Sequence, residues 1–545
     1  MGLGHAISDF IFLGEKSQRQ RNRGEEATPV SGLSGPLGRV GLVAVFLILL
    51  AALMRGQIFQ GSYFRALSDG NRVRKVPIHA PRGIIYDRNG TALVSNLPSY
   101  RLKNCRPTGQ CEISVISKAQ AIELQAKGLD DNQTLELDST RNYIYGPATA
   151  HLLGYTGYLG DIVVGRGGLE EQYERTLSGR DGEEVIEVDA LGNKLRTLAT
   201  VLPESGKDLN TNIDIAVQKT AYESIREVIG AVVVTEPNTG AVLALASSPS
   251  FDPEHVADYL TDKNQPLFGR AISGTYPPGS TFKIITATAG LETGKITEST
   301  EITDPGILII GPYKFPNWKY LRDGGTQGTL NVVSAIQKSN DIFFYRVGEW
   351  VGVDGLVDWA KRFGLASKLG IDLPGEATGS LPNRTDWYLG DTYHLAIGQG
   401  DLLVTPLQVN RWTSVIGSNG KICQPMVVGT GGCKDSGISQ KTLGLVKQGL
   451  VAACSPGGTA WPLFGFAVHG SQYQIACKTG TAEFGDPKDR THAWLTAYAP
   501  VCAEATAGKA CQPQIAVTVL IEAGGEGDTA AAPIVKKILE TWFTK

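Results

Sequence analysis

The most hydrophobic stretch of the chain lies near its N-terminus. Val40–Met54 contains 15 residues and no charge, and an arginine flanks it on each side. A helix needs about 20 apolar residues to cross a bilayer, and 37–59 is long enough if both arginines extend towards the headgroups. A cleaved signal peptide is the alternative. We expect a retained anchor over 37–59, because its polar leader is long and has no clear cleavage site.

The remaining hydrophobic pattern divides the chain into two folded regions. Residues 60–205 alternate short extended runs with turns and hold no catalytic constellation, which predicts a β-rich pedestal that is structural or docks a partner. Within it, we expect Arg82 and Asp87 to form a structural ion pair or to serve function directly. Residues 1–36 are polar and basic, which predicts a disordered cytoplasmic tail.

Residues 206–545 alternate helical and strand periodicities. Two apolar runs joined by Pro-Asn-Thr-Gly predict a hairpin of strands 231–236 and 241–246. Helices are expected at 216–229 and 531–543, and further strands at 474–483, 493–499 and 514–522. This order predicts an α/β fold, in which a central antiparallel sheet is flanked by helices and a helical lobe is inserted between its strands.

The eight cysteines all follow the predicted anchor. Three close pairs suggest local disulfides in an oxidising compartment, namely Cys105 with Cys111, Cys423 with Cys433, and Cys502 with Cys511. A zinc site is the rival interpretation, but no spacing is Cys-x-x-Cys and no histidines cluster with the cysteines. Cys454 and Cys477 either pair with each other or leave a free thiol. Equal numbers of Lys and Arg lie close before and after the anchor, so the positive-inside rule does not decide its orientation. We expect the C-terminal bulk outside the membrane because all the cysteines lie there.

The first candidate for chemistry is the segment Tyr276-Pro-Pro-Gly-Ser-Thr-Phe-Lys283. Its prolines and glycine forbid helix before Ser280, and the residues after it favour helix, so Ser280 is expected at a helix N-terminus. Lys283 lies one turn later on the same face, which predicts a nucleophile with a base beside it. Ser-x-x-Lys recurs at Ser418–Lys421, where Asn-Gly indicates a surface turn instead.

Two further motifs follow in the chain. Ser339-Asn340-Asp341 precedes an apolar helical run, and its plain interpretation is a helix cap. Lys478-Thr479-Gly480-Thr481 reads as a strand, in which Lys478 and Gly480 face one way and the two threonines face the other. Such a strand offers a cation to an anionic substrate group.

The three motifs in this order resemble the signature of the penicillin-binding protein and serine β-lactamase superfamily. More closely, the chain from about Arg82 resembles the class B penicillin-binding proteins, which are D,D-transpeptidases that cross-link peptidoglycan. Several shorter motifs continue the resemblance: Arg82–Gly90, Gly168-Leu-Glu170, Gly179–Gly182, Gly398-Gln-Gly400, Thr405-Pro406 and Gly457-Gly-Thr459. Asp341 stands where many members have Asn, and aspartate is commoner in elongation-type than in division-type members.

The resemblance implies a role for each motif residue. Ser280 would attack the D-Ala-D-Ala carbonyl of a stem peptide after Lys283 removes its proton, and the amides of Ser280 and Thr481 would hold the oxyanion. Ser339 would relay a proton to the leaving group, with Asp341 orienting either the relay or Lys283. Lys478 and Thr479 would bind the substrate carboxylate, and Lys478 would also lower the pKa of Lys283.

The same resemblance implies β-lactams as ligands that acylate Ser280, and a polytopic membrane glycosyltransferase as partner. A D,D-carboxypeptidase or a β-lactamase on this scaffold, and a non-catalytic sensor or scaffold, are the alternatives. The net charge of -3 shows no basic excess, so we expect no nucleic acid. Phosphate-binding loops, nucleophile elbows and zinc-protease motifs are absent from the sequence, and we expect no metal or cofactor.

Overall fold

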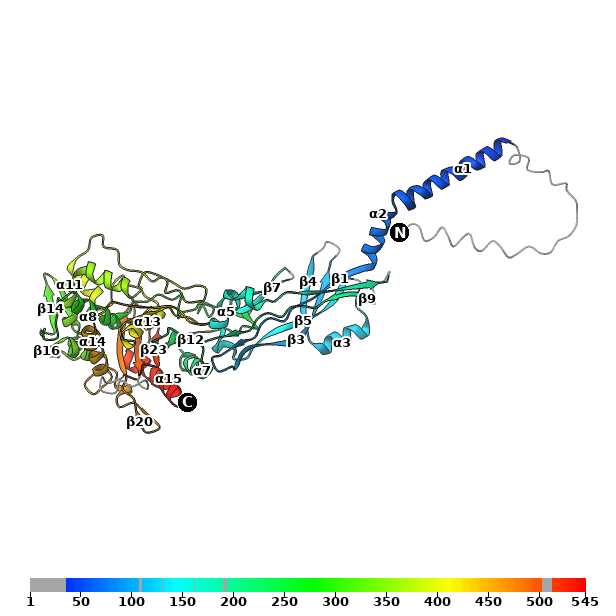
Figure 1. The fold of residues 1–545 in the computed structure, drawn as a ribbon. Helices are drawn as coiled ribbons and strands as arrows, with labels where there is room; N and C mark the ends of the chain where they lie inside the picture. The colour runs from blue at the N-terminus through cyan, green and yellow to red at the C-terminus, as the bar shows by residue number, and fades with distance from the viewer. Residues whose placement is uncertain (1–35, 107–109, 131, 161, 190–193, 502–511) are drawn as a thin grey trace. The chain divides into compact units, whose positions relative to one another are not determined.

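The computed structural model describes residues 36–106, 110–130, 132–160, 162–189, 194–501 and 512–545, without the side chains of 68–71 (Figure 1). The chain divides into two compact units. One comprises the described residues up to Arg74 together with 186–197, and the other comprises 75–185 with 198–545.

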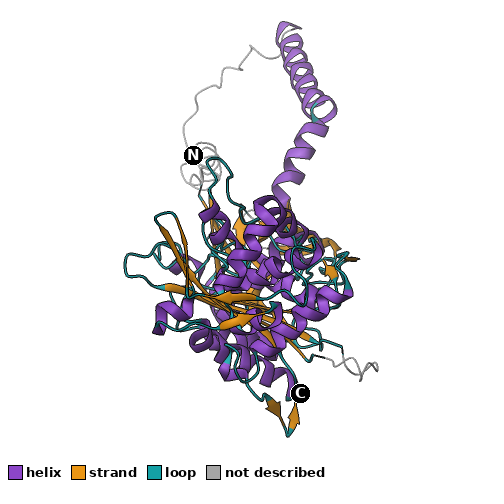
Figure 2. Cartoon of the chain, turned by 90° about the vertical axis from the view of Figure 1, so that its left-hand side faces the viewer, coloured by secondary structure: helices purple, strands orange, loops and turns teal. Residues whose placement is uncertain are grey.

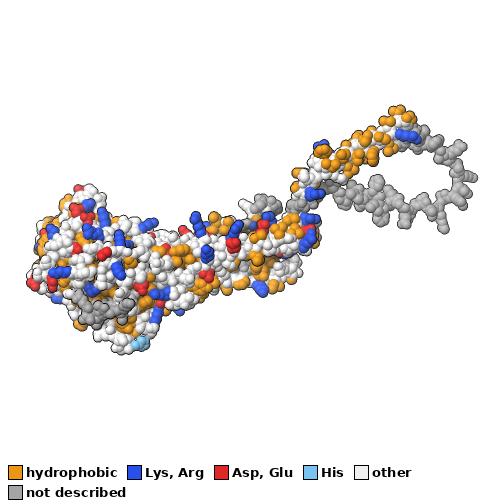
Figure 3. Space-filling model, in the orientation of Figure 1, with side chains coloured by type: hydrophobic (Ala, Val, Ile, Leu, Met, Phe, Trp, Pro, Cys, Tyr) orange, Lys and Arg blue, Asp and Glu red, His pale blue; other side chains and the backbone are white. Residues whose placement is uncertain are grey.

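The first unit begins with the predicted anchor. Helix α1 (Pro36–Met54) continues through the π-helical turn η2 (Arg55–Phe59), and α2 (Gly61–Arg72) follows. Pro36–Phe59 is, within the described part of the chain, the one helical stretch long and apolar enough to cross a membrane. Its side chains are almost all exposed, and Figure 3 shows them as a nearly continuous hydrophobic surface with arginine at the ends.

The predicted β-rich pedestal is confirmed. One sheet has the order β10-β2-β3-β4, with β5 also pairing with β3, and a second has the order β1-β8-β9. The long strands β3 and β5 pair antiparallel over eleven positions, and this two-stranded ribbon runs through the pedestal. The elements are β1 (Val73–Ile78), β2 (Ile85–Tyr86), β3 (Ala92–Cys105), β4 (Cys111–Ile116), α3 (Lys118–Lys127), β5 (Gln133–Tyr143), η3 (Gly146–Ala148), α4 (Ala150–Leu153), β6 (Tyr155–Leu159), β7 (Ile162–Arg166), α5 (Gly168–Gln172), α6 (Glu174–Leu177), β8 (Gly182–Val188), β9 (Lys194–Val201) and β10 (Leu209–Asn210).

Arg82 and Asp87 do not form the predicted ion pair with each other. The Arg82 guanidinium is buried and pairs with Glu170 at 2.7 Å and with Glu174 at 2.8 Å. The Asp87 carboxylate instead accepts the backbone amides of Asn89 and Thr91, both at 2.8 Å, and so closes the turn between β2 and β3. Both residues are structural, but the acidic partner of Arg82 comes from the helices α5 and α6.

The predicted central sheet is also confirmed. Its order is β12-β11-β23-β22-β21 and every neighbouring pair is antiparallel. Figure 2 shows strands of this region surrounded by helices. The strands are β11 (Gly230–Thr235), β12 (Val242–Ser248), β21 (Ala476–Glu483), β22 (Thr491–Ala499) and β23 (Ile515–Ile521). They are buried on both faces, which explains their nearly unbroken apolar runs.

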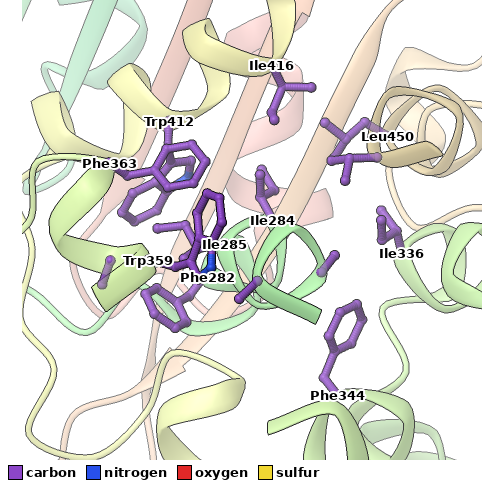
Figure 4. Close-up of a cluster of buried hydrophobic side chains, with 14 of the residues drawn as sticks. Phe282, Ile284, Ile285, Ile336, Phe344, Trp359, Phe363, Trp412, Ile416 and Leu450 are labelled. Carbon is purple, nitrogen blue, oxygen red and sulfur yellow. The ribbon is translucent and has the colours of Figure 1, made fainter. Parts of the chain in front are cut away.

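Alternate residues of each strand enter different cores. On β22, Leu495 packs with α7 (Ile215–Ile225) and α15 (Ala532–Phe543), which cover one face of the sheet. Trp494 and Tyr498 pack on the other face, against α8 (Lys283–Glu292) and α13 (Pro406–Gly417). In that second core, large side chains of α8, α13 and neighbouring helices point towards one another around Phe282 (Figure 4).

The segment between β12 and β21 forms the predicted helical lobe with small hairpins. Ser418–Lys421 forms a tight turn between α13 and β17, as expected for the second Ser-x-x-Lys. The remaining elements are η4 (Val256–Tyr259), η5 (Gly279–Phe282), β13 (Ile302–Asp304), β14 (Ile307–Ile310), β15 (Tyr313–Pro316), α9 (Trp318–Asp323), β16 (Gly328–Leu330), α10 (Val332–Lys338), α11 (Asp341–Arg362), α12 (Leu389–Ala396), β17 (Lys421–Cys423), β18 (Cys433–Asp435), α14 (Gln440–Ala453), η6 (Trp461–Leu463), β19 (Ala467–Val468), β20 (Ser471–Gln472) and η8 (Gly527–Ala531).

Three disulfides are present in the described part of the chain. Cys105–Cys111 and Cys423–Cys433 confirm two predicted pairs, and in each the cysteines face each other across a hairpin. Cys454–Cys477 joins the end of α14 to β21, so the alternative of a free thiol there is wrong. The predicted pair Cys502–Cys511 lies outside the described residues.

Candidate active site

Ser280 lies in the 3₁₀ turn η5, directly before α8. Gly279 permits this turn because its φ is +53°, a left-handed value that side chains disfavour. A Cβ at Gly279 would also lie 2.9 Å from the Thr481 carbonyl oxygen, so the turn packs directly against β21. Gly398 bonds to the same turn through its carbonyl, which accepts the Gly279 amide at 2.8 Å, and a Cβ there would overlap the Gly279 carbonyl.

Lys283 is completely buried one turn after Ser280. Its ammonium donates to Asp341 Oδ1 at 2.6 Å, to the Ser339 carbonyl at 2.8 Å and to Ser339 Oγ at 3.4 Å. Burial lowers the pKa of Lys283, and the Asp341 carboxylate opposes that effect. The helix start therefore carries a cation held by a carboxylate, in a place where water does not solvate it.

The Ser339-Asn340-Asp341 motif is the joint between two helices. Helix α10 ends at Lys338 and is capped by Ser339, whose φ of 53° and ψ of 40° are left-handed, and α11 begins at Asp341. The Asn340 side chain accepts the Phe343 amide at 2.7 Å, so the plain interpretation as a helix cap holds for that residue. The cap aims Ser339 and Asp341 at Lys283.

Lys478 lies on β21 and is also fully buried. Its Nζ donates to Ser339 Oγ at 2.7 Å and to the Thr479 carbonyl at 2.9 Å. Burial and the nearby Lys283 ammonium hold the pKa of Lys478 well below its ordinary value. Repulsion between two charged amines acts on both of them, so the predicted effect of Lys478 on the pKa of Lys283 stays a prediction. A single hydroxyl, that of Ser339, lies between two buried amines.

The threonines of β21 make side-chain contacts that the sequence analysis did not predict. Thr479 Oγ1 lies 2.8 Å from Thr459 Oγ1, and Thr481 donates to Glu526 Oε2 at 2.9 Å. Gly480 packs against the Ser280 turn, since a Cβ there would lie 3.2 Å from the Pro278 carbonyl. Thr459 stood in a recognisable Gly-Gly-Thr motif, but nothing in the sequence signalled Glu526. In the described chain, no cluster of His, Cys, Asp and Glu side chains offers a metal site.

Comparison with known proteins places this geometry in a family. Residues 230–540 match the penicillin binding protein transpeptidase domain, and 113–211 match the penicillin-binding protein dimerisation domain. The peptidoglycan D,D-transpeptidase MrdA of Acinetobacter baumannii is 30% identical over 92% of this chain and 86% of its own length. The protein of the same name from Escherichia coli K12 is 30% identical over 92% of both chains.

Solved structures agree. The penicillin-binding protein PBP2 of Helicobacter pylori, in complex with MreC, has a TM-score of 0.73 at 27% identity and covers 87% of this chain and 99% of its own. PBP2 of Pseudomonas aeruginosa has a TM-score of 0.67 at 30% identity over 87% of this chain and 97% of its own. These relatives are of the elongation type. The chain belongs to the class B penicillin-binding proteins, the family of the penicillin-binding protein transpeptidases.

Proposed function

We propose that the chain is a peptidoglycan D,D-transpeptidase that acts through an acyl-enzyme on Ser280. The observation that carries this proposal is the Ser339 hydroxyl, which accepts hydrogen bonds from both Lys283 and Lys478, while Lys283 lies one helical turn after Ser280. Two amines of lowered pKa joined by a hydroxyl form a path along which a proton can move in both directions.

In acylation, Ser280 Oγ attacks the carbonyl carbon of the penultimate D-alanine and gives its proton to neutral Lys283. The carbonyl oxygen becomes an oxyanion, which the amides of Ser280 and Thr481 stabilise. The C–N bond then breaks. Ser339 gives its proton to the leaving nitrogen and receives one from Lys283, so that D-alanine leaves as a neutral amine.

In the second step, an amino group of another stem peptide attacks the ester carbonyl. Its proton returns along the same path to Ser280 Oγ, which leaves as the hydroxyl, and a new amide forms the cross-link. Thr479 and Thr481 would bind the terminal carboxylate of the donor peptide through their hydroxyl groups. Lys478 is turned towards Ser339, so we assign it to the relay rather than to direct contact with the carboxylate.

We also propose a division of the chain into four regions. It consists of a cytoplasmic tail over 1–36, an anchor over 37–59, a pedestal over 60–205 and a transpeptidase domain over 206–545. Among the described residues, one helix is long and apolar enough to cross a membrane, which supports an inner-membrane, single-pass placement. The disulfides support an extracytoplasmic catalytic domain. A polytopic membrane glycosyltransferase is the proposed partner, supported by a TM-score of 0.73 to a structure titled as coordination of polymerization and crosslinking by a peptidoglycan synthase complex.

The test uses the full chain in detergent with a fluorescent penicillin. A stable adduct on Ser280, located by peptide mass spectrometry and missing from Ser280→Ala, supports the nucleophile. A synthetic donor peptide ending in D-Ala-D-Ala with an amine acceptor then distinguishes the products. Cross-linked product supports a transpeptidase, free D-alanine without cross-links indicates a carboxypeptidase, and an adduct without turnover indicates a sensor. No adduct on folded wild-type protein would refute the proposal.

A further inference from the structure

A cluster of polar side chains is buried behind the Ser339–Asp341 joint. Asn340 of the joint belongs to it, and its other members lie outside the three motifs. Asp304 and Asn317 are 4% and 0% exposed, and Asn340 is 1% exposed. Burying a carboxylate and two amides is costly unless each finds partners. The segment that carries Asp304 and Asn317 is the small-hairpin region between β13 and β16, which lies far from the catalytic residues in sequence.

Asp304 is the anchor of this cluster. Its Oδ2 accepts Asn317 Nδ2 at 2.8 Å, Asn340 Nδ2 at 2.9 Å and the Gln327 amide at 3.0 Å. Its Oδ1 accepts the Gly306 amide at 2.7 Å. Four donors fix this carboxylate in one orientation, and two of them are side-chain amides that connect to the catalytic joint.

Asn317 connects the anchor to Asp341. Its amide nitrogen donates to Asp304, and its carbonyl oxygen accepts the backbone amide of Asp341 at 3.1 Å. Because one neighbour is a carboxylate and the other is an N–H, the two ends of the amide cannot be exchanged. Only a side chain with both a donor and an acceptor satisfies both neighbours at once.

Trp318, the residue after Asn317, bonds to the second carboxylate oxygen of Asp341. The Trp318 amide donates to Asp341 Oδ2 at 2.8 Å, whereas Lys283 donates to Oδ1 at 2.6 Å. The Trp318 indole also donates to the Lys338 carbonyl at 3.1 Å. One carboxylate oxygen of Asp341 therefore accepts a hydrogen bond from the Trp318 amide, and the other accepts one from Lys283.

We propose that Asn317 is a positioning residue of the acyl-transfer reaction, which acts through Asp341 on Lys283 and is fixed in turn by Asp304. The proposal rests on the proposed function. Asn317 touches neither substrate nor reacting atoms. It sets the position of the Asp341 backbone, and through it the direction from which the carboxylate meets the Lys283 ammonium. The charged groups that face Lys283 are Asp341 from α11 and Lys478 from β21.

The test is the acylation rate constant per active site, measured with a fluorescent penicillin on the full chain in detergent. Binding and acylation are separated by varying the penicillin concentration, and the final stoichiometry counts competent sites. Asn317→Ala should lower the acylation rate constant about tenfold, with the binding constant little changed, because the lost interaction matters in the transition state. A purely structural role would instead lower the stoichiometry and leave the per-site rate at the wild-type value.

A matched control is Asn410→Ala. Asn410 is a buried asparagine of α13 that bonds to the Val233 and Ala516 carbonyls and not to the catalytic joint. It should lower the melting temperature without changing the per-site rate. If Asn317→Ala does not fold, Gln327→Leu replaces it. Gln327 is only half-buried, and its side chain bonds to Asn340 and to the Lys338 carbonyl. It should lower the per-site rate about threefold.

The two proposals fail in different ways. Wild-type chain that labels on Ser280, together with Asn317 and Gln327 variants that label at the wild-type rate, would overturn the positioning role and leave the transpeptidase proposal intact. Wild-type chain that takes no label would refute the proposed function first. A per-site rate lowered to the same degree by Asn410→Ala would also overturn the positioning role, because the effect would then be general.

Discussion

Replacing Asp341 with asparagine should move the acid limb of the acylation pH profile to lower pH. The substitution keeps the size of the side chain and removes its charge from a completely buried ammonium 2.6 Å away. Acylation requires neutral Lys283, and Asp341 raises the pKa of Lys283 against the lowering caused by burial. Without the carboxylate the pKa falls, so the amine is neutral at a lower pH.

The size of the shift follows from the geometry. At 2.6 Å and an effective dielectric constant of about 20, the Coulomb attraction is about 6 kcal/mol, which is an upper bound. The asparagine carbonyl can still accept a hydrogen bond from Lys283, so we expect the limb to move by about 1–3 pH units. Lys478 changes in the same direction, because Asp341 also raises the pKa of that residue.

The assay is the rate constant of acylation by a fluorescent penicillin between about pH 5 and pH 9. Asp358→Asn removes an exposed carboxylate of the same helix and should leave the profile unchanged. A limb that stays in place in Asp341→Asn, or that moves to higher pH, would refute the assignment of Lys283 as the base that Asp341 controls.

Three other substitutions test separate parts of the site. Lys478→Met should abolish cross-linking and raise the stability by about 1 kcal/mol at neutral pH, because a buried amine of lowered pKa is replaced by an apolar side chain. Its gain in melting temperature should shrink as the pH rises towards the ordinary lysine pKa, since the unfolded chain binds the proton more tightly than the folded one. Ser339→Gly keeps the left-handed backbone and the carbonyl that Lys283 uses but loses the hydroxyl, so acylation should fall about 10²- to 10⁴-fold while thermal melting changes little. The double variant Cys454→Ala, Cys477→Ala opens a loop of 23 residues and should destabilise the domain by about 3 kcal/mol in a denaturant titration, with Ser280 still labelled at low temperature.

The sequence predicted the elements whose signals are local. The hairpin of β11 and β12 was predicted because Pro-Asn-Thr-Gly and two apolar runs lie within a few residues of one another. The sheet and the inserted lobe followed from the order of such runs. Within each motif, short spacings predicted which side chains share a face. That the three motifs form one site was implied by the resemblance to the penicillin-binding proteins and not by spacing.

The sequence could not predict contacts between residues that are far apart in the chain. Asn317 and Asp341 are 24 positions apart, and no periodicity relates them. The pairing of Arg82 with Glu170 spans 88 positions, so the nearer Asp87 was chosen wrongly. The lowered pKa of Lys478 depends first on its burial and then on the nearby Lys283 amine, and only the fold brings about both.

On the proposed mechanism, the two glycines at the Ser280 turn would restrict how resistance to β-lactams arises. Gly279 adjoins Ser280 and meets β21, and Gly398 meets Gly279, so at either position any side chain would push the nucleophile away from Thr481. On that mechanism a β-lactam and a stem peptide are attacked by the same hydroxyl in the same place, so such a change would slow both reactions together. Substitutions that discriminate between drug and peptide must therefore arise further out, where the two ligands differ in shape.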